Sequence, residues 1–318
     1  MAAEHYPVML EEAVEALSLE GDEKVVDATF GGGGHARRIL RKLGPEGMVV
    51  GVDRDPEAAA RAEGLAEEDR RFTFRPGAYD EVLEGLVEEG ERVDAVLFDL
   101  GLSSYQVDEA ARGFSYVREG PLDMRMDPER GESAADFLNE AEPPEIVDVL
   151  VGYGDIPRGE ARRVAREVVR RRPLATTLEL SEAVRAAVGW KERGGNPAKR
   201  IFQAVRVYVN DELGGLERAL SAAERLLLPG GRLAAITFHS GEDRMVKRFI
   251  SERTGRCVCP PELPVCICGA HPIFRKGVVR KPAPREVEEN PRSASARLRS
   301  AVRTAEPLET DRTPEVTS

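Results

Sequence analysis

Residues 25–36, VVDATFGGGGHA, join an apolar run to four consecutive glycines and a helix-like segment. Glycines at the first turn between a strand and a helix let backbone N–H groups approach a ligand closely. The letters GGGGHA also satisfy a loose form of the dinucleotide fingerprint, and Asp53 lies where that fingerprint places a carboxylate for ribose hydroxyls. NAD and S-adenosylmethionine both fit this pattern. Two simpler interpretations stay open: a turn that only reverses the chain, and Asp53 as the N-cap of the next helix.

Strand-like and helix-like segments alternate around this turn. After a covering helix at 10–17, with apolar positions at helical spacing, the patterns predict strands at 24–30, 47–52, 71–75 and 92–100, and helices at 36–43, 56–66 and 79–88. Such alternation predicts an α/β fold with a doubly wound, mostly parallel, Rossmann-like sheet.

The alternation stops after residue 102. Residues 103–204 contain helical patterns, among them 160–171 and 178–188, but no convincing strand. The sheet pattern then resumes with a long helix at 197–228, a turn at 229–231, a strand at 232–238, a helix at 244–252 and strands at 274–280 and 296–302. We therefore predict a sheet domain in two parts, 1–104 and 205–303, around a helical insert, 105–204. A polar tail at 304–318 has the composition of a disordered segment.

Charge and hydropathy exclude some classes of protein. The net charge of −11 argues against indiscriminate polyanion binding, although cations can still gather on one face. The sequence contains no apolar run near the roughly 18 residues that a membrane helix needs, and the first residues lack a secretory pattern. We expect a cytoplasmic protein without a membrane partner.

Polar residues follow the predicted fourth and fifth strands. The fourth ends in DLGLSS, which begins at Asp99, and the fifth ends in TFHSGEDR, which contains His239. The carboxyl edge of a parallel sheet is where such folds bind ligands. An exocyclic base amine is a poor nucleophile, so acceptors for its N–H groups and in-line orientation would assist methyl transfer. Asp99 is the candidate acceptor. His239 is either a general base or a hydrogen-bonded positioning group.

A series of longer motifs is far more specific than the glycine turn. In chain order, from His5 to about Arg299, they read HYPVMLEE, DATFGGGGH, GVDRDPEA, DLGLSS, RGFSYVREGPLDMRMD, NPAKRIFQAVRVYVNDEL, LLLPGGRLAAITFHSGEDR and ENPRSASARLRS. Together they resemble the MraW/RsmH family, which methylates N4 of a cytidine in bacterial small-subunit ribosomal RNA with S-adenosylmethionine. Asn196 and Gly241 depart from the family pattern of His and Leu. These departures bear on substrate contacts more than on the reaction class.

The resemblance implies a Rossmann-like methyltransferase domain interrupted by a helical substrate-recognition domain. It also implies a cofactor site in which Gly33, Gly34 and His35 contact the methionine end, Asp53 the ribose and Tyr79 the adenine, completed by Asp99 and Gln106. The implied partner is small-subunit ribosomal RNA, free or within the assembled small subunit. Whether the protein forms a homodimer stays open.

Residues 112–127 combine arginine, aromatic and aspartate side chains in a predicted loop. This composition fits a base taken out of its stack and recognised on its polar edge. Asp123 would accept from the cytosine amine, or would pair with Arg125 and order the loop. Arg125, Lys199 and Arg200 are candidates for substrate binding, and the last two would contact phosphates. The arginine-rich run at 162–172 fits a solvated helix face as well as it fits RNA.

All four cysteines, Cys257, Cys259, Cys266 and Cys268, form a C-x-C-x6-C-x-C cluster. Zinc binding, reduced structural thiols and redox chemistry are all open for it, with His271 as a competing ligand. Two further functions compete with the methyltransferase. An NAD-dependent oxidoreductase is favoured only by the glycine spacing, and a non-catalytic ribosome assembly or binding factor would keep a cofactor pocket without turnover.

Overall fold

The structure is a computed structural model that describes residues 6–189, 196–255 and 271–306. The chain divides into two compact units, one formed by Met1–Gly101 with Gly215–Ser318 and the other by Leu102–Gly214. The predicted insert, 105–204, lies within the second unit, and its role in substrate recognition stays a prediction. The four cysteines and the tail from residue 307 onward lie outside the described residues.

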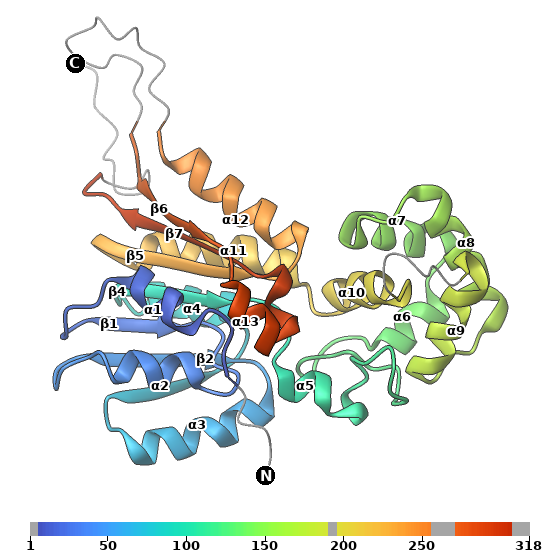
Figure 1. Cartoon of the computed structure of the whole chain (residues 1–318), viewed down its shortest axis with the longest axis horizontal. Helices are drawn as coiled ribbons and strands as arrows, with labels where there is room; N and C mark the ends of the chain where they lie inside the picture. Colours follow the sequence, from blue (N-terminus) through green and yellow to red (C-terminus); the bar gives the residue numbers. More distant parts are fainter. Residues whose placement is uncertain (1–5, 190–195, 256–270, 307–318) are drawn as a thin grey trace, which may run out of the picture. The chain divides into compact units, whose positions relative to one another are not determined.

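The first unit is built on a sheet with the strand order β3-β2-β1-β4-β5-β7-β6 (Figure 1). The strands are β1 Lys24–Asp27, β2 Met48–Asp53, β3 Phe72–Pro76, β4 Val93–Asp99, β5 Leu227–Thr237, β6 Phe274–Arg280 and β7 Arg297–Arg303. The neighbours among β1 to β5 pair in parallel, whereas β7 runs antiparallel to both β5 and β6. The α/β, mostly parallel fold predicted from the sequence is therefore confirmed.

Each central strand buries side chains on both faces, because successive residues point in opposite directions. Val25, Val49 and Ala95 face one core, whereas their neighbours Val26, Val50 and Val96 face the other. The first of these cores also takes residues of α1, α2 and α3, and the second takes residues of α4, α11 and α12. Apolar helices thus cover the sheet on both sides, as a doubly wound fold requires.

The helices of the first unit are α1 Leu10–Leu17, α2 Gly34–Leu40, α3 Pro56–Glu68, α4 Tyr79–Glu88, α12 Ser240–Arg253 and α13 Pro284–Glu289, with a 3-10 turn η2 at Pro291–Ser295. Helix α11, Glu212–Leu226, begins in the second unit and continues into the first. Two sequence predictions about these helices need correction. Helix α12 begins four residues before the predicted start at 244, because His239 caps it. The single helix predicted at 197–228 is wrong.

That region forms two helices, α10 Ala198–Val209 and α11, separated at Asn210 and Asp211. Asp211 has a φ of 47°, which a continuous helix does not allow. The buried side chain of Asn210 donates from Nδ2 to the Met124 carbonyl (2.8 Å) and accepts at Oδ1 from the Met126 N–H (2.7 Å). The break therefore coincides with a tertiary contact that the apolar pattern along the helix does not encode.

The second unit is a helical domain with its own apolar core. Its other elements are α5 Ser104–Asp108, the 3-10 turn η1 Ala110–Arg112, α6 Ala134–Glu140, α7 Pro143–Gly154, α8 Arg158–Arg171 and α9 Thr177–Val188. Leu122 and Met124, from the loop that precedes α6, are buried in this core with residues of α7, α8 and α10. Among the described residues of the whole chain, no helix has the length and apolar character needed to cross a membrane.

Candidate active site

Four acidic side chains gather where the parallel strands of the first unit end. Asp53, Asp27 and Asp99 close β2, β1 and β4, and Glu242 stands in the first turn of α12, directly after β5. Asp27 repels both Asp53 and Asp99, and Glu242 repels Asp99, strongly enough to raise carboxyl pKa values. This carboxyl edge is where doubly wound sheets bind their ligands.

Asp53 joins the glycine turn to the second strand. Its Oδ2 accepts from the Gly31 N–H (2.7 Å), and its Oδ1 accepts from the Asp55 N–H (2.9 Å). The N-cap of α3 is Asp55, whose Oδ1 accepts from the Glu57 N–H (3.0 Å). The alternative in which Asp53 caps this helix is therefore wrong. Burial and the nearby Asp55 charge raise the pKa of Asp53.

Packing gives Gly33 and Gly34 a reason to be glycine that does not depend on a ligand. A Cβ on Gly33, whose φ is 75°, would lie 2.7 Å from the ring of Phe30. A Cβ on Gly34 would clash with Cγ of Pro7. The turn holds these neighbours tightly, whereas Gly32 is exposed. Contact of Gly33 and Gly34 with a cofactor stays a prediction.

His35, at the start of α2, is buried beside Asp99. The His35 Nδ1 lies 3.5 Å from Asp99 Oδ2. Burial lowers the pKa of His35 to about 4, and a hydrogen bond with the backbone of Val8 offsets this only in part. Burial, together with the charges of Asp27 and Glu242, raises the pKa of Asp99 well above its ordinary value. The imidazole is therefore neutral at pH 7, and the pair is not a conventional salt bridge.

Two acceptors at this edge lack donors. Among the described residues, none donates to Oδ2 of Asp27 or to Oδ1 of Asp99, although both atoms are buried. Oδ1 of Asp27 accepts a long bond from the Thr29 N–H (3.3 Å). Burial and the Asp53 charge raise the pKa of Asp27 to about 7. Sequence reasoning did not assign Asp27 a role, although its place before the glycines was the available signal.

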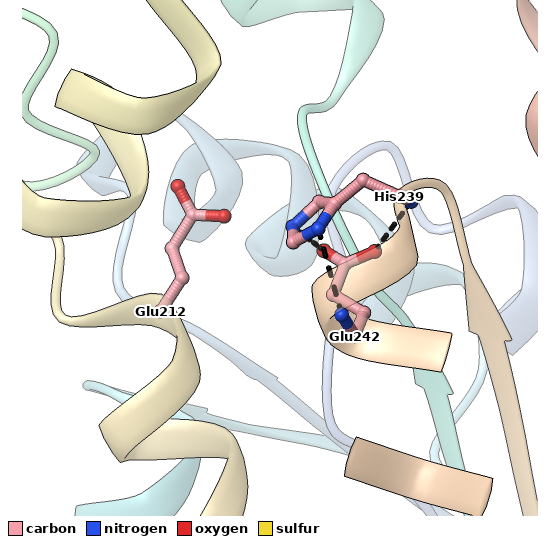
Figure 2. A group of neighbouring side chains, drawn as sticks. All are labelled: Glu212, His239 and Glu242. Carbon is pink, nitrogen blue, oxygen red and sulfur yellow. Dashed lines mark hydrogen bonds and ion pairs between the residues drawn. The ribbon is translucent and has the colours of Figure 1, made fainter. Parts of the chain in front are cut away.

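His239 lies in the turn between β5 and α12, where it pairs with Glu242 (Figure 2). Its Nδ1 accepts from the Gly241 N–H (3.2 Å), and its Nε2 lies 3.1 Å from Oε1 of Glu242. Glu242 Oε2 in turn accepts from the backbone N–H groups of Phe238 (2.7 Å) and His239 (3.2 Å). Both side chains are buried. These contacts favour the positioning role for His239 over that of a general base. Sequence reasoning missed Glu242, for which the FHSGED pattern was the signal.

Tyr79 begins α4 beside the end of β2. The Gly77 N–H donates to the Asp53 carbonyl (2.9 Å), which fixes the chain just before this helix. The Tyr79 ring meets that of Phe98 edge to face, with centroids 5.9 Å apart. Tyr79 is half-buried at the sheet edge, and its contact with an adenine stays a prediction.

The other predicted site residues belong to the second unit. Gln106 completes the capping box of α5 with Ser103. Asp123 and Arg125 form the two-point ion pair that the sequence left open, with Nε–Oδ1 and Nη2–Oδ2 distances of 2.9 and 2.7 Å. Burial alone would raise the pKa of Asp123, but the hydrogen bonds from Arg125 outweigh it and lower that pKa.

Lys199 and Arg200 are both exposed on α10. The Arg200 guanidinium donates to the Gly154 carbonyl at the end of α7, from Nε at 3.0 Å and Nη2 at 2.7 Å, and also contacts the Asp155 carbonyl. It satisfies carbonyls at the end of a helix, which is a structural role. Phosphate contact by Lys199 and Arg200 stays a prediction.

The carboxyl edge of the sheet therefore combines negative charge, unused acceptors and a neutral imidazole. Such a set suits a ligand that brings a positive charge and hydrogen-bond donors, because unpaired buried carboxylate oxygens are costly until they are satisfied. The pyrophosphate of a dinucleotide would instead add negative charge to this edge. The site geometry thus favours a cationic ligand.

Comparison with known proteins gives a consistent result along the whole chain. The family model described as the MraW methylase family matches residues 2–304. The ribosomal RNA small subunit methyltransferase H of Rubrobacter xylanophilus is 71% identical over 306 residues, covering 96% of this chain and 98% of that protein. The protein of the same name from Symbiobacterium thermophilum is 47% identical, covering 95% and 98%. A solved rRNA methylase from Streptococcus thermophilus has a TM-score of 0.41 and 12% identity, with 93% of each chain covered.

Proposed function

This chain belongs to the MraW methylase family, whose methyl donor is S-adenosylmethionine, and from that premise we propose that it methylates N4 of a cytidine in small-subunit ribosomal RNA. The observation that carries the proposal is the acidic carboxyl edge, with its unused acceptors on Asp27 and Asp99. The names of the curated relatives, which are small-subunit ribosomal RNA methyltransferases, support the choice of substrate.

The residues of the edge fit S-adenosylmethionine, which when bound supplies an electrophilic methyl group on a positively charged sulfur. Asp99 and Asp27 would neutralise that positive charge and accept from its ammonium group, which satisfies their free oxygens. Asp53, already anchored by Gly31 and Asp55, has lone pairs left for ribose hydroxyls. Tyr79 offers the adenine a half-buried ring at the end of the same edge. His35 completes the proposed cofactor site within the first unit, and a cofactor contact by Gln106 stays a prediction from the family resemblance.

Methyl transfer needs little from the protein beyond the orientation of the two reactants and hydrogen-bond acceptors for the cytosine amine. The Asp99 carboxylate would accept an N–H of the cytosine amine and turn its lone pair toward the methyl group. Burial raises the pKa of Asp99 and so disfavours its charged form. A cation bound beside it would favour the carboxylate. His239, held by Glu242 and the start of α12, would support the shape of this edge rather than take the amine proton, which would pass to water after methyl transfer.

Of the two roles that the sequence left open for Asp123, the proposal takes the pairing with Arg125. Its carboxylate is already engaged by Arg125, so it keeps fewer lone pairs for a cytosine amine. The pair orders the loop at 121–127, and Arg112 and Asn210 fix the same loop through its backbone. We propose that this rigid loop, with Arg125 and the exposed Lys199 and Arg200, contributes to RNA recognition by the helical unit.

The two other candidate functions make different demands. In the NAD-dependent oxidoreductase fold, the strand order 3-2-1-4-5-6 places a parallel sixth strand beside the fifth. Here the antiparallel β7 occupies that position, and the family is a methylase family. A non-catalytic binding factor would share the cofactor site, and only an activity measurement separates it from the enzyme.

The decisive experiment transfers labelled methyl from S-adenosylmethionine to small ribosomal subunits, and to naked RNA, from a strain that lacks this protein. Nucleoside mass spectrometry then identifies the product. N4-methylcytidine is the expected product. Cofactor binding without transfer to either substrate would instead support the binding factor, and label on another nucleoside would overturn the proposed target.

A further inference from the structure

Strand β6 carries a concentration of positive charge in a chain that is acidic as a whole. Residues 271–285 contain five lysines and arginines and no acidic residue, whereas the chain as a whole has a net charge of −11. Four of these cations, which we call the basic edge strand, lie on β6 or directly after it: Arg275, Lys276, Arg280 and Lys281. All four side chains are exposed.

Most of this charge is not neutralised by the described residues of the first unit. Among the described residues, no acidic side chain forms an ion pair with Arg275, Lys276 or Lys281. Arg280 pairs with Glu15 at 2.8 Å, but both partners are largely exposed, so water and salt weaken the pair. By contrast, exposed arginines elsewhere in the unit, such as Arg75 and Arg248, face glutamates.

The strand is also open to a partner. It is the outermost strand of the sheet, next to β7, and Figure 1 shows it at that border. Phe274 is its only fully buried residue, and the following positions are exposed or half-exposed. Over seven residues the strand is about 20 Å long, which gives a linear array of cations rather than one isolated charge.

The register of the sheet connects this array with the candidate active site. Asp99 pairs with Ile236 of β5, Ile236 with Leu298 of β7, and Leu298 with Arg280 of β6. Three strand spacings of about 4.8 Å put Arg280 roughly 14 Å from Asp99 along the same edge. Lys281 follows at that edge, whereas Arg275 and Lys276 lie toward the opposite end of β6.

We propose that the basic edge strand binds the phosphate backbone of the RNA substrate and leads it to the carboxyl edge where the base is methylated. This inference rests on the proposed function, because that function makes RNA the partner. The contact is a backbone one, since exposed lysines and arginines along a strand neutralise phosphates without reading sequence. It places part of the RNA-binding surface on the sheet unit itself, where three of the four cations form no ion pair with the described residues.

Charged edge strands also have a simpler use, because lysine and arginine prevent edge-to-edge pairing of sheets. The two explanations differ in what the cations do to RNA affinity and to its salt dependence. A protective edge predicts self-association when the charges are removed and no change in RNA binding. The phosphate contact predicts weaker RNA binding and a smaller salt slope with the protein still monodisperse.

The test compares the double variant Lys276→Gln/Lys281→Gln with the control Arg75→Gln/Arg248→Gln, which removes two exposed cations that are paired with glutamates. Binding to naked small-subunit ribosomal RNA is measured from 0.05 to 0.3 M salt. Loss of two contacts to single-stranded phosphates lowers the salt slope by about 1.4. The loss of affinity relative to the wild-type protein should therefore be about 12-fold larger at 0.05 M salt than at 0.3 M salt. The control should lower the salt slope clearly less than the lysine variant does. Circular dichroism and S-adenosylmethionine affinity check that both variants fold.

An unchanged RNA affinity and slope in the lysine variant would overturn the proposal, whether or not the variant self-associates. Equal losses in variant and control would also overturn it, since they would indicate a general charge effect. The binding measurement does not depend on turnover. If the wild-type protein binds RNA through these lysines but transfers no methyl group to it, the phosphate contact stands and the proposed function fails.

Discussion

The His35 Nδ1 lies 3.5 Å from Asp99 Oδ2, across the turn that follows β1. The imidazole stays neutral because burial, which lowers its pKa, outweighs the hydrogen bond with the Val8 backbone. This pair links the glycine motif with β4, and its burial leads to a prediction about the protonation of His35.

We expect His35 to remain uncharged at pH 5. Its pKa is lowered from 6.5 to about 4, so the native state binds fewer protons than the unfolded state in this range. Stability from this group is fully present above pH 6.5 and declines as the pH falls toward 4, by about 2 kcal/mol at pH 5. Nitrogen chemical shifts of the ring in an NMR titration measure this directly. An imidazolium signal for His35 at pH 6 would contradict the prediction.

Asp27 should make the stability of the native protein depend on pH in the opposite direction. Its pKa is raised from 3.8 to about 7, so the native state binds more protons than the unfolded state between these values. The native protein therefore loses stability as pH rises through this window, by roughly 2 to 3 kcal/mol between pH 5 and 8. Asp27→Asn should remove that loss, which urea unfolding at both pH values can measure. Parallel pH profiles for the variant and the wild-type protein would argue against a raised pKa.

Asp53→Ala should weaken S-adenosylmethionine binding by at least about tenfold, because the Gly31 and Asp55 N–H groups lose their acceptor and the ribose loses its carboxylate. Calorimetric titration measures the affinity. Asp55→Ala is the matched control, since it removes the N-cap of α3 and costs about 1 kcal/mol of stability. If both variants bind the cofactor equally well, Asp53 has no direct role.

Asp99→Asn should lower the rate of methyl transfer by at least about a hundredfold while the protein keeps its fold. Asparagine preserves the size of the side chain and the backbone bond from the Asp99 N–H to Thr29 Oγ1 (2.6 Å), but it has no negative charge. Single-turnover transfer of labelled methyl to RNA measures the effect, and RNA affinity serves as the control. A variant with wild-type transfer would remove Asp99 from the proposed chemistry.

Asn210→Ala should loosen the loop at 121–127, because the buried Met124 carbonyl and Met126 N–H lose their partner. We expect a loss of roughly 2 to 4 kcal/mol in stability and weaker RNA binding. Asn139→Ala is the control, since Asn139 makes an equivalent two-point contact with the Leu174 backbone. Both variants should melt at a lower temperature than the wild-type protein, but only Asn210→Ala should also bind RNA more weakly. Equal affinities in the two variants would separate the loop from RNA recognition.

The sequence by itself determined the fold class, the family and most of the elements of the first unit. Apolar patterns of period two and 3.6 depend only on which face a residue buries, so strands such as β4 and helices such as α4 could be predicted closely. The motifs at Asp53, Asp99 and His239 were found the same way, because they follow predicted strands. The edge of the sheet that holds the candidate site follows from chain direction alone.

Tertiary structure decided what each of these residues contacts. The helix break at Asn210 depends on a loop more than 80 residues away. The N-cap role of Asp55, the packing of Pro7 against Gly34 and the pairing of Asp123 with Arg125 are likewise choices among several partners that the sequence allows. The pKa values of Asp27 and Asp99 depend on burial and on charges that β1, β2 and α12 bring together. A local pattern does not contain this information, because the energy of a buried polar group is set by neighbours that only the folded chain brings together.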